Sequence, residues 1–193
     1  MLAMALNYGS HLHGEGEPKT PEPFYKTRTS LNCHLGQIII PRDSSKVDAE
    51  AELVVVIGRK ASNVKQSEAL SYIFGYTCGN DVSARDWQSM DKSWWRAKSS
   101  DTFSPIGPWI VTGIDVGNLN IKCKINDKIV QECNSSEMIF GIPEIISFIS
   151  KYITLDPGDC IFTGTSGTAG QIYPGDKVEV SVQNIGVLTN TCV

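Results

Sequence analysis

The chain has no excess of basic residues and no long apolar run. Its 193 residues carry 17 Lys and Arg against 21 Asp and Glu, which gives a formal net charge of −4. No stretch approaches the roughly 20 apolar residues that a membrane-spanning helix needs. A mildly acidic chain without a basic cluster has no electrostatic attraction to nucleic acid or to an anionic membrane. Neither is expected as a partner, and local charges would have to hold any anionic substrate.

The sequence also lacks the cysteine spacings that are typical of zinc and redox sites. None of its six cysteines belongs to a CxxC pair, and Cys160 lies inside the apolar run GDCIF. This usage indicates reduced thiols rather than a disulfide framework. The first residues, MLAMALNYG, are too short and too uncharged for a secretory signal. We therefore expect a cytoplasmic protein, with a mitochondrial location as the alternative.

Apolar periodicity predicts a mainly β, α+β domain. The β-branched runs GQIIIP, AELVVVIG and PWIVTG predict strands, as do residues 2–6. Residues 120–133 predict a hairpin that turns at Asn126 and Asp127. Two Pro-Gly-Asp turns, at 157–159 and 174–176, each precede a further strand. We expect about eight to ten strands in all.

Two helices are expected among these strands. The first spans Val64 to Phe74, with Asn63 as its N-cap and Gly75 at its end. The second begins near Pro143, a residue that suits the first helical position. Its apolar side chains recur at helical spacing, which predicts one buried face. That face consists of Ile142, Ile145, Ile146, Ile149 and Tyr152.

Two carboxylates precede the most apolar run of the chain. Because side chains alternate along a strand, Glu50 and Glu52 point the same way, about 7 Å apart at the backbone. Asp81 follows the turn-prone Gly79-Asn80 pair, so it can return to the same end of the sheet. Three carboxylates without a nearby His or Cys suit Mg²⁺, with Mn²⁺ or Ca²⁺ as alternatives. Spacing alone also fits solvated acids at a strand end, which is the commoner arrangement.

The chain resembles the fumarylacetoacetate hydrolase family, in particular its C-terminal catalytic domain. Seven motifs carry the likeness, in the family's order and over nearly the whole chain: NYGSH, PFYKTRTSL, EAELVVVIG, GYTCGNDVSARDWQ, AKSSDTFSPIGPW, DPGDCIFTGT and YPGDKVEVSVQNIGVLTN. The resemblance implies a mixed β-roll of layered sheets and a homodimer. It also implies a lid segment at residues 1–35 and a metal-binding catalytic region at 36–193, within one domain overall.

The resemblance implies roles for individual residues. Glu50, Glu52 and Asp81 would be the metal ligands. Arg85 and Gln88 would contact the substrate carboxylate and carbonyl, which suits the bidentate geometry of a guanidinium. Without the resemblance, Arg85 and Asp86 would be read as a surface ion pair and Lys98 as a solvated charge. Three further positions complete the set of implied site residues: Lys98 beside the metal, Thr165 at the substrate and His11 as the lid's general base.

The lid departs from the family pattern. Family members that hydrolyse C–C bonds carry NYxxHxxE, in which His and Glu activate water together. Here Asn7, Tyr8 and His11 match, but Gly14 stands where the Glu is expected and Glu15 lies one residue late. Positions i and i+4 share a helix face, yet GEGEPKTP disfavours a stable helix. A TGTSGTAG loop also lacks the proline that many relatives have there.

These features lead to three hypotheses about function. The first is a Mg²⁺-dependent hydrolase that cleaves a C–C bond in acylpyruvate- or fumarylacetoacetate-like 2-oxo acids through a metal-stabilised enolate. The second is an oxaloacetate-type decarboxylase or a hydroxyheptadienedioate-type isomerase at the same metal site, which the imperfect lid favours. The third is a non-catalytic relative that binds metal or ligand, since fold alone does not fix function.

Overall fold

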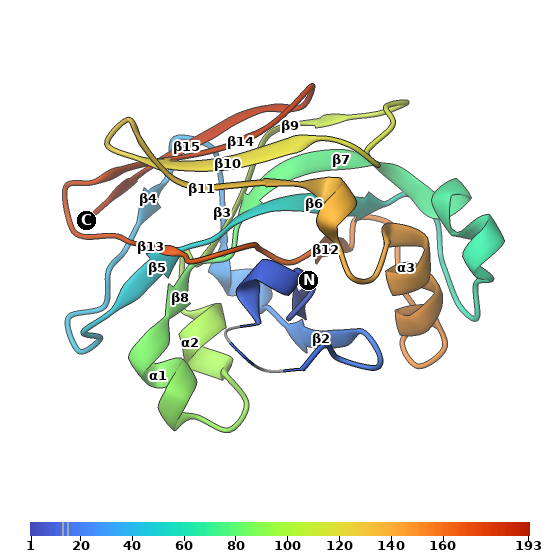
Figure 1. Ribbon diagram of the computed structural model, residues 1–193, viewed down its shortest axis with the longest axis horizontal. Coiled ribbons are helices and arrows are strands. Elements are labelled where there is room, and N and C mark those ends of the chain that lie inside the picture. The colour runs from blue at the N-terminus through green and yellow to red at the C-terminus, as the bar shows by residue number, and fades with distance from the viewer. Residues whose placement is uncertain (13, 15) are drawn as a thin grey trace.

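The computed structural model describes residues 1–12, 14 and 16–193, and most of its regular structure is strand (Figure 1). The largest sheet has seven strands in the order β2-β1-β12-β6-β7-β9-β3. Their bounds are Glu22–Tyr25 (β2), Leu2–Ala5 (β1), Cys160–Phe162 (β12), Ala51–Ile57 (β6), Ile73–Asn80 (β7), Ser104–Val111 (β9) and Leu31–Asn32 (β3).

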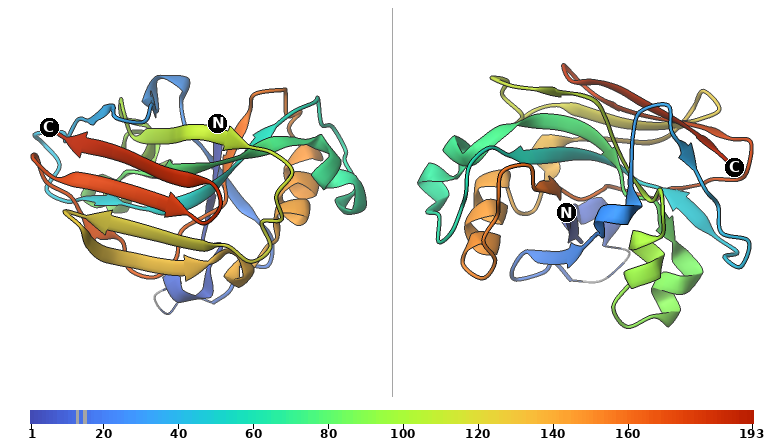
Figure 2. Two further views of the ribbon diagram at one scale, coloured as in Figure 1. Left: turned by 90° about the horizontal axis from the view of Figure 1, so that it is seen from above. Right: turned by 180° about the vertical axis from the view of Figure 1, so that it is seen from behind.

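A five-stranded sheet, ordered β11-β10-β14-β15-β4, packs over one face of the large sheet (Figures 1 and 2). Its strands are Lys128–Asn134 (β11), Asn120–Ile125 (β10), Lys177–Val182 (β14), Gly186–Cys192 (β15) and Gln37–Ile38 (β4). A small third sheet joins Gly170–Gln171 (β13), Val47–Ala49 (β5) and Ser83–Ala84 (β8). These layered, mixed sheets confirm the expected mainly β, α+β fold class.

The helices lie on the other side of the large sheet from the five-stranded sheet, or at its end (Figures 1 and 2). The α-helices span Arg85–Met90 (α1), Trp95–Ser99 (α2) and Ile142–Ser150 (α3). Short 3₁₀ helices span Gly9–His11 (η1), Arg28–Ser30 (η2), Gln66–Tyr72 (η3) and Ser135–Glu137 (η4). No helix among the described residues is long and apolar enough to cross a membrane.

Strand β6 divides its side chains between two apolar clusters. Ala51, Leu53, Val55 and Ile57 join the main core between the sheets, whereas the alternate positions Val54 and Val56 join a smaller cluster with Phe162. Glu50 and Glu52 continue the second face, as the period-two alternation of a strand requires. The charged end of the strand therefore faces away from the main core.

Two predicted elements are confirmed in detail. The hairpin β10-β11 turns at Asn126 and Asp127, whose φ angles of 48° and 67° are left-handed, as the favoured two-residue hairpin turn requires. Helix α3 begins at Ile142 with proline in its first turn, and its four isoleucines are buried. The prediction that Tyr152 belongs to this buried face is wrong, because Tyr152 lies beyond the helix and is exposed.

The helix predicted for Val64 to Phe74 is wrong in kind and in extent. Only Gln66–Tyr72 is helical, and it is a 3₁₀ helix; Asn63 has a positive φ and is not its cap. Ile73 and the residues after it instead form β7, which pairs with β6 from Ile57 onward. Gly75 does not end a helix but lies inside that strand, where a Cβ would come within 2.6 Å of Ile110 and Val111, so glycine is required there.

The sequence also understated the number of elements. The described residues contain strands up to β15 and three α-helices, against the expected eight to ten strands and two helices. Helices α1 and α2 were missed because each is only five or six residues long, with no apolar period to reveal it. Both helices carry residues that line the candidate site.

Candidate active site

A small cavity of about 50 Å³, here called the inner cavity, is lined by residues of the large sheet, of helices α1 and α2, and of the N-terminal segment. All eight site residues predicted from the sequence line it: His11, Glu50, Glu52, Asp81, Arg85, Gln88, Lys98 and Thr165. Met4, Phe24 and Trp94 add apolar walls. Residues far apart in the chain therefore meet at one place.

Strand register explains why the three carboxylates meet. Glu50 lies between β5 and β6, and Glu52 is the second residue of β6. Strand β7 runs antiparallel to β6 with Ala51 opposite Asn80, so Asp81 emerges beside Glu50. The Asp81 amide donates to the Glu50 carbonyl at 3.0 Å, and the Asn80 side chain accepts from the Glu50 amide at 2.9 Å. The strand pairing and these two hydrogen bonds thus fix the backbone of Glu50 and Asp81.

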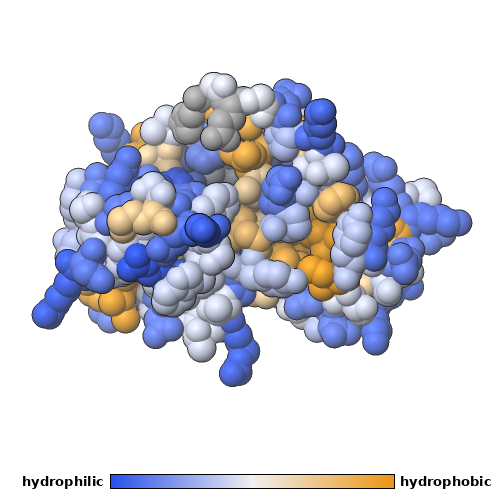
Figure 3. Space-filling model, turned by 90° about the horizontal axis from the view of Figure 1, so that it is seen from below, coloured by the Kyte–Doolittle hydropathy of each residue, from blue (hydrophilic) through white to orange (hydrophobic). Residues whose placement is uncertain are grey.

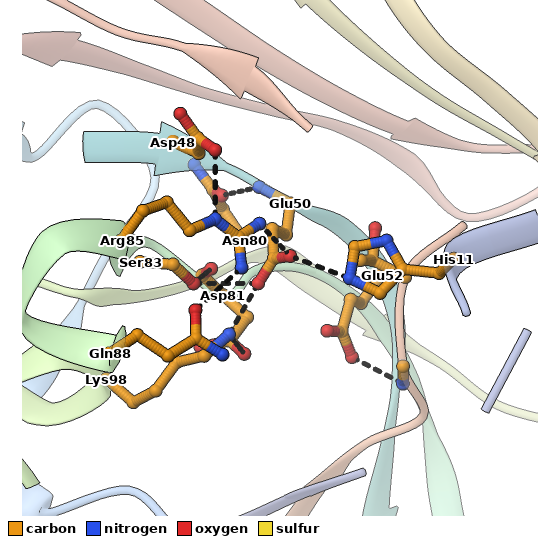
Figure 4. Close-up of polar contacts among 12 residues, drawn as sticks. His11, Asp48, Glu50, Glu52, Asn80, Asp81, Ser83, Arg85, Gln88 and Lys98 are labelled. Atoms are coloured by element: carbon orange, nitrogen blue, oxygen red, sulfur yellow. Dashed lines mark hydrogen bonds and ion pairs between the residues drawn. The ribbon is translucent and has the colours of Figure 1, made fainter. Parts of the chain in front are cut away.

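Three cationic side chains face these carboxylates. The Lys98 ammonium bridges two of them, at 2.5 Å from Glu50 Oε2 and 2.7 Å from Asp81 Oδ2 (Figure 4). Lys26 donates to the other oxygen of Asp81 and to the Lys98 carbonyl. Arg85 donates to Glu50 Oε1. Glu50 and Asp81 are therefore neutralised by the protein's own cations.

Glu52 is placed differently. It is 99% buried, and it accepts a hydrogen bond of 2.6 Å from the amide of Gly164. Burial, together with the charges of Asp81 and Glu50, raises the pKa of Glu52 well above its usual range. Burial also raises the pKa of Glu50, but the charges of Lys98 and Arg85 outweigh it and hold that pKa well below its usual range. Glu50 is thus held as a paired carboxylate, whereas the surroundings of Glu52 oppose its ionisation.

The donor set suits a hard divalent cation. Carboxylate oxygens are the preferred ligands of Mg²⁺, Mn²⁺ and Ca²⁺. A cation beside Glu52 would relieve the repulsion that raises its pKa. Among the described residues, however, no three His, Cys, Asp or Glu side chains already form a cation cage, because the Lys98 ammonium lies between Glu50 and Asp81. Binding would require that ammonium to move aside.

His11 reaches the same cavity from the N-terminal segment. Its Nδ1 lies 2.6 Å from the Gly167 carbonyl, and its Nε2 lies 3.6 Å from Glu50 Oε1 (Figure 4). The contact to a carbonyl fixes a proton on Nδ1, which leaves Nε2 toward the cavity. Glu15, the suggested lid partner, lies outside the described residues. Asn7 anchors the segment through Nδ2 to the carbonyls of Phe140 and Thr163, at 3.1 and 2.8 Å.

The suggested substrate contacts are partly engaged within the protein. Arg85 also donates from Nε to Asp48 and from Nη1 to Gln88, both at 2.9 Å. The Thr165 hydroxyl donates to the Ala51 carbonyl at 3.1 Å and accepts from Gln131 at 3.1 Å. Arg85 and Gln88 therefore form one unit at the cavity wall, whereas Thr165 is held by the backbone.

Sequence reasoning missed two charged residues beside the cavity. Lys26 belongs to the PFYKTRTSL motif, but a single lysine in a loop carries no local sign of burial. Asp48 lies two residues before Glu50, so strand alternation predicts that it shares the face of Glu50 and Glu52. The alternation of side chains along a strand could therefore have identified Asp48 from the sequence.

A larger cavity of about 490 Å³, here called the outer cavity, adjoins the inner one. The two share Leu6, His11, Arg85, Gln88 and Trp94 as lining residues. Lys46, Asp48 and Thr168 line only the outer cavity. Its volume lies in the range of small-molecule sites. A ligand held in the inner cavity can therefore extend into the outer one.

Residues 1–193 match the model of the fumarylacetoacetate (FAA) hydrolase C-terminal family. The chain belongs to this family of enzymes. It is 45% identical over 195 residues to an uncharacterised protein of Archaeoglobus fulgidus, covering 100% of this chain and 78% of that protein. It is 37% identical over 206 residues to a mitochondrial oxaloacetate tautomerase of Rattus norvegicus, covering 100% of this chain and 66% of that protein.

Solved structures agree with this assignment. A 5-carboxymethyl-2-hydroxymuconate delta-isomerase from Mycobacterium smegmatis superposes with a TM-score of 0.94 at 40% identity, over 100% of this chain and 77% of that one. A 2-hydroxyhepta-2,4-diene-1,7-dioate isomerase from Mycobacterium marinum also superposes with a TM-score of 0.94. It is 41% identical, and the match covers 100% of this chain and 73% of that one. A fumarylpyruvate hydrolase from Pseudomonas aeruginosa, solved with Mn²⁺ and pyruvate, shares the fold at 24% identity with a TM-score of 0.92, over 100% and 88%.

Proposed function

We propose that this enzyme uses a divalent cation, Mg²⁺ or Mn²⁺, to interconvert the keto and enol forms, or the double-bond isomers, of a 2-oxo acid. Glu50, Glu52 and Asp81 would hold the cation. The observation that carries the proposal is the meeting of these three buried carboxylates in one cavity, where Glu52, unlike Glu50 and Asp81, forms no ion pair with any described residue.

Once bound, the cation would supply Lewis-acid polarisation of the 2-oxo oxygen, which makes the neighbouring C–H more acidic. The protein's own groups perform the remaining tasks. Arg85 and Gln88 would bind the substrate carboxylate at the cavity wall. His11, with Nε2 toward the cavity, would take a proton from carbon and return it elsewhere. Lys98 would place a positive charge beside the substrate oxygen that becomes negative.

Three observations support proton transfer over C–C hydrolysis, the first hypothesis from the sequence. Tautomerisation and isomerisation need one acid–base group, and His11 lies at the cavity. Hydrolysis also needs an activated water, for which the family pattern supplies a Glu at the position that Gly14 holds here. The names of similar proteins, an oxaloacetate tautomerase and two dioate or muconate isomerases, point the same way.

The test is a substrate panel. Oxaloacetate, a hydroxyheptadienedioate and an acylpyruvate would be assayed with Mg²⁺, with Mn²⁺ and with EDTA. We expect keto–enol or double-bond interconversion to have the largest kcat/KM and to fall at least about a hundredfold in EDTA. Equal rates with and without EDTA would contradict the metal site. The third hypothesis, a non-catalytic relative, requires that no member of the panel is turned over.

Hydrolysis of a C–C bond remains a second candidate, because His11 occupies the position expected of a lid base. Release of pyruvate from the acylpyruvate, at a kcat/KM above that of every isomerisation, would establish it. Release of CO₂ from oxaloacetate would establish the decarboxylase instead. Whether the activity is isomerisation or C–C hydrolysis, a His11→Ala variant should lose it at least about a hundredfold. A His11→Ala enzyme with full activity would remove His11 from the mechanism.

We also propose that the chain is a homodimer. Strand β9 pairs with β3 only at Ser104 and Pro105, so its edge beyond them has no strand partner among the described residues. Trp109 and Ile110, on this segment, are exposed and line a largely apolar cavity of about 680 Å³ with Leu31. Apolar hollows of this kind mark interaction sites. Light scattering should give a dimer for the wild type and a monomer for Ile110→Glu.

The proposed compartment is the cytoplasm or the mitochondrial matrix. All six cysteines are free thiols, and five of them are buried. Buried thiols without disulfides are typical of reducing compartments.

A further inference from the structure

The inner and outer cavities differ in size and in chemistry. The inner cavity, at about 50 Å³, has room for an ion and the few atoms that chelate it. The outer cavity, at about 490 Å³, has room for an organic group. Because five lining residues are shared, a substrate chelated at its 2-oxo acid end would extend into the outer cavity.

One strand sets a row of charges along this path. Lys46, Asp48, Glu50 and Glu52 alternate along β5 and the start of β6, so their side chains share a face. At about 3.3 Å per residue, the Lys46 backbone lies roughly 13 Å from that of Glu50. The row therefore runs from the carboxylates of the inner cavity to a lysine at the outer cavity.

The charge of Lys46 is available to a ligand. Asp48, its neighbour on this face, already pairs with Arg85 at 2.9 Å (Figure 4). Lys46 itself is exposed and has no ion pair with any described residue. Asp48 Oδ1 is buried at the wall of the outer cavity without a hydrogen-bond partner among the described residues, so it can accept from a hydroxyl or a water there. These features together make a polar subsite at the far end of the path.

We propose that the outer cavity binds the end of the substrate remote from the 2-oxo acid, and that Lys46 selects substrates whose remote end is a second carboxylate. This proposal rests on the proposed function and narrows its substrate class to long dicarboxylates. A short 2-oxo diacid such as oxaloacetate would remain within the inner cavity and would not reach Lys46. Lys46 is then a specificity-determining residue, which acts on binding and not on the reacting atoms.

The test compares two ligands that differ only in the remote carboxylate, 2-oxoheptanedioate and 2-oxoheptanoate. Their binding in the presence of Mg²⁺ would be measured by calorimetry. We expect the wild type to prefer the diacid about tenfold, as one ion-paired carboxylate at an accessible site allows. The preference should shrink at high salt, because exposed ion pairs are screened. Lys46→Ala should abolish it, and Lys46→Glu should reverse it.

Two controls make the outcome specific. Lys151→Ala removes an exposed lysine at the end of α3 and should leave the preference unchanged. In turnover assays, Lys46→Ala should raise KM for a hydroxyheptadienedioate about tenfold with kcat unchanged, and should leave both constants unchanged for oxaloacetate. If the wild type bound the two ligands with equal affinity, the proposed role of Lys46 would be wrong, while the proposed function would still stand. If neither ligand bound, the proposed function would fail together with it.

Discussion

Two regions of this enzyme are equally buried and chemically opposite. Around α3, the side chains of Ile145, Ile146 and Ile149 are 0–1% exposed and pack only against apolar groups of the main core. In the inner cavity, Glu50 and Glu52 are each 1% exposed and carry acidic groups. Burial of apolar surface stabilises a fold, whereas burial of a charge costs free energy unless it is paired. The isoleucines therefore serve stability, whereas the burial of the carboxylates fits the metal binding proposed above.

The largest effect is expected at Asp81, where both roles meet. Asp81→Ala removes a proposed metal ligand and also leaves the ammonium groups of Lys26 and Lys98 buried with less compensation. Loss of one partner of a buried pair costs about 3–5 kcal/mol of folding free energy. Chemical denaturation should show that loss, and kcat/KM of the folded fraction should fall at least about a thousandfold. An active, fully stable variant would show that Asp81 belongs to neither network.

Ile146→Ala should separate stability from activity. The side chain is fully buried on α3, so truncation leaves a cavity that costs about 2–5 kcal/mol. Because α3 contributes no lining residue to the inner cavity, kcat/KM should remain within about twofold at a temperature where the variant is folded. A large fall in kcat/KM there would mean that the two regions are coupled.

Glu52→Gln should move stability and activity in opposite directions. The amide oxygen of Gln can still accept from Gly164, and the substitution removes a carboxyl group whose ionisation is opposed by burial and by the charges of Asp81 and Glu50. In EDTA, the variant should be more stable than the wild type by about 1–3 kcal/mol. Its metal-dependent activity should fall about a hundredfold or more, and Mg²⁺ should raise its melting temperature less than it raises that of the wild type. A less stable variant in EDTA would mean that Glu52 is compensated.

The smallest effect is expected at the hairpin turn, which belongs to neither region. Asn126 has a φ of 48°, a conformation that asparagine tolerates better than alanine does. Asn126→Ala should cost about 1 kcal/mol in thermal denaturation, with metal affinity and kcat/KM unchanged. A change in metal affinity would show that the five-stranded sheet contributes to the site.

The same contrast explains what the sequence could predict. Apolar periodicity located β6, the hairpin and α3, because burial of one face leaves a regular spacing of residues such as Ile142 and Ile145. It failed at Ile73 and Gly75, where pairing with β6 overrides the local helical pattern. The family resemblance supplied all eight predicted site residues, and all eight line the inner cavity. The roles of these residues stay predictions. The division of the chain into a lid segment at 1–35 and a catalytic region at 36–193 also stays a prediction. Lys26 had no such signal, because its burial depends on contacts with residues over fifty positions away.

The parallel pairing of β1 with β12 has a consequence for how the enzyme matures. Leu2 lies beside Ile161 and Ala3 beside Phe162, so β1 is synthesised long before β12, its parallel partner. Contacts between such distant residues slow folding. His11, which follows β1 closely, can take its place only after most of the chain has been synthesised. A nascent chain that ends before Cys160 should therefore lack the proposed acid–base group at the inner cavity, even when the middle strands have already formed.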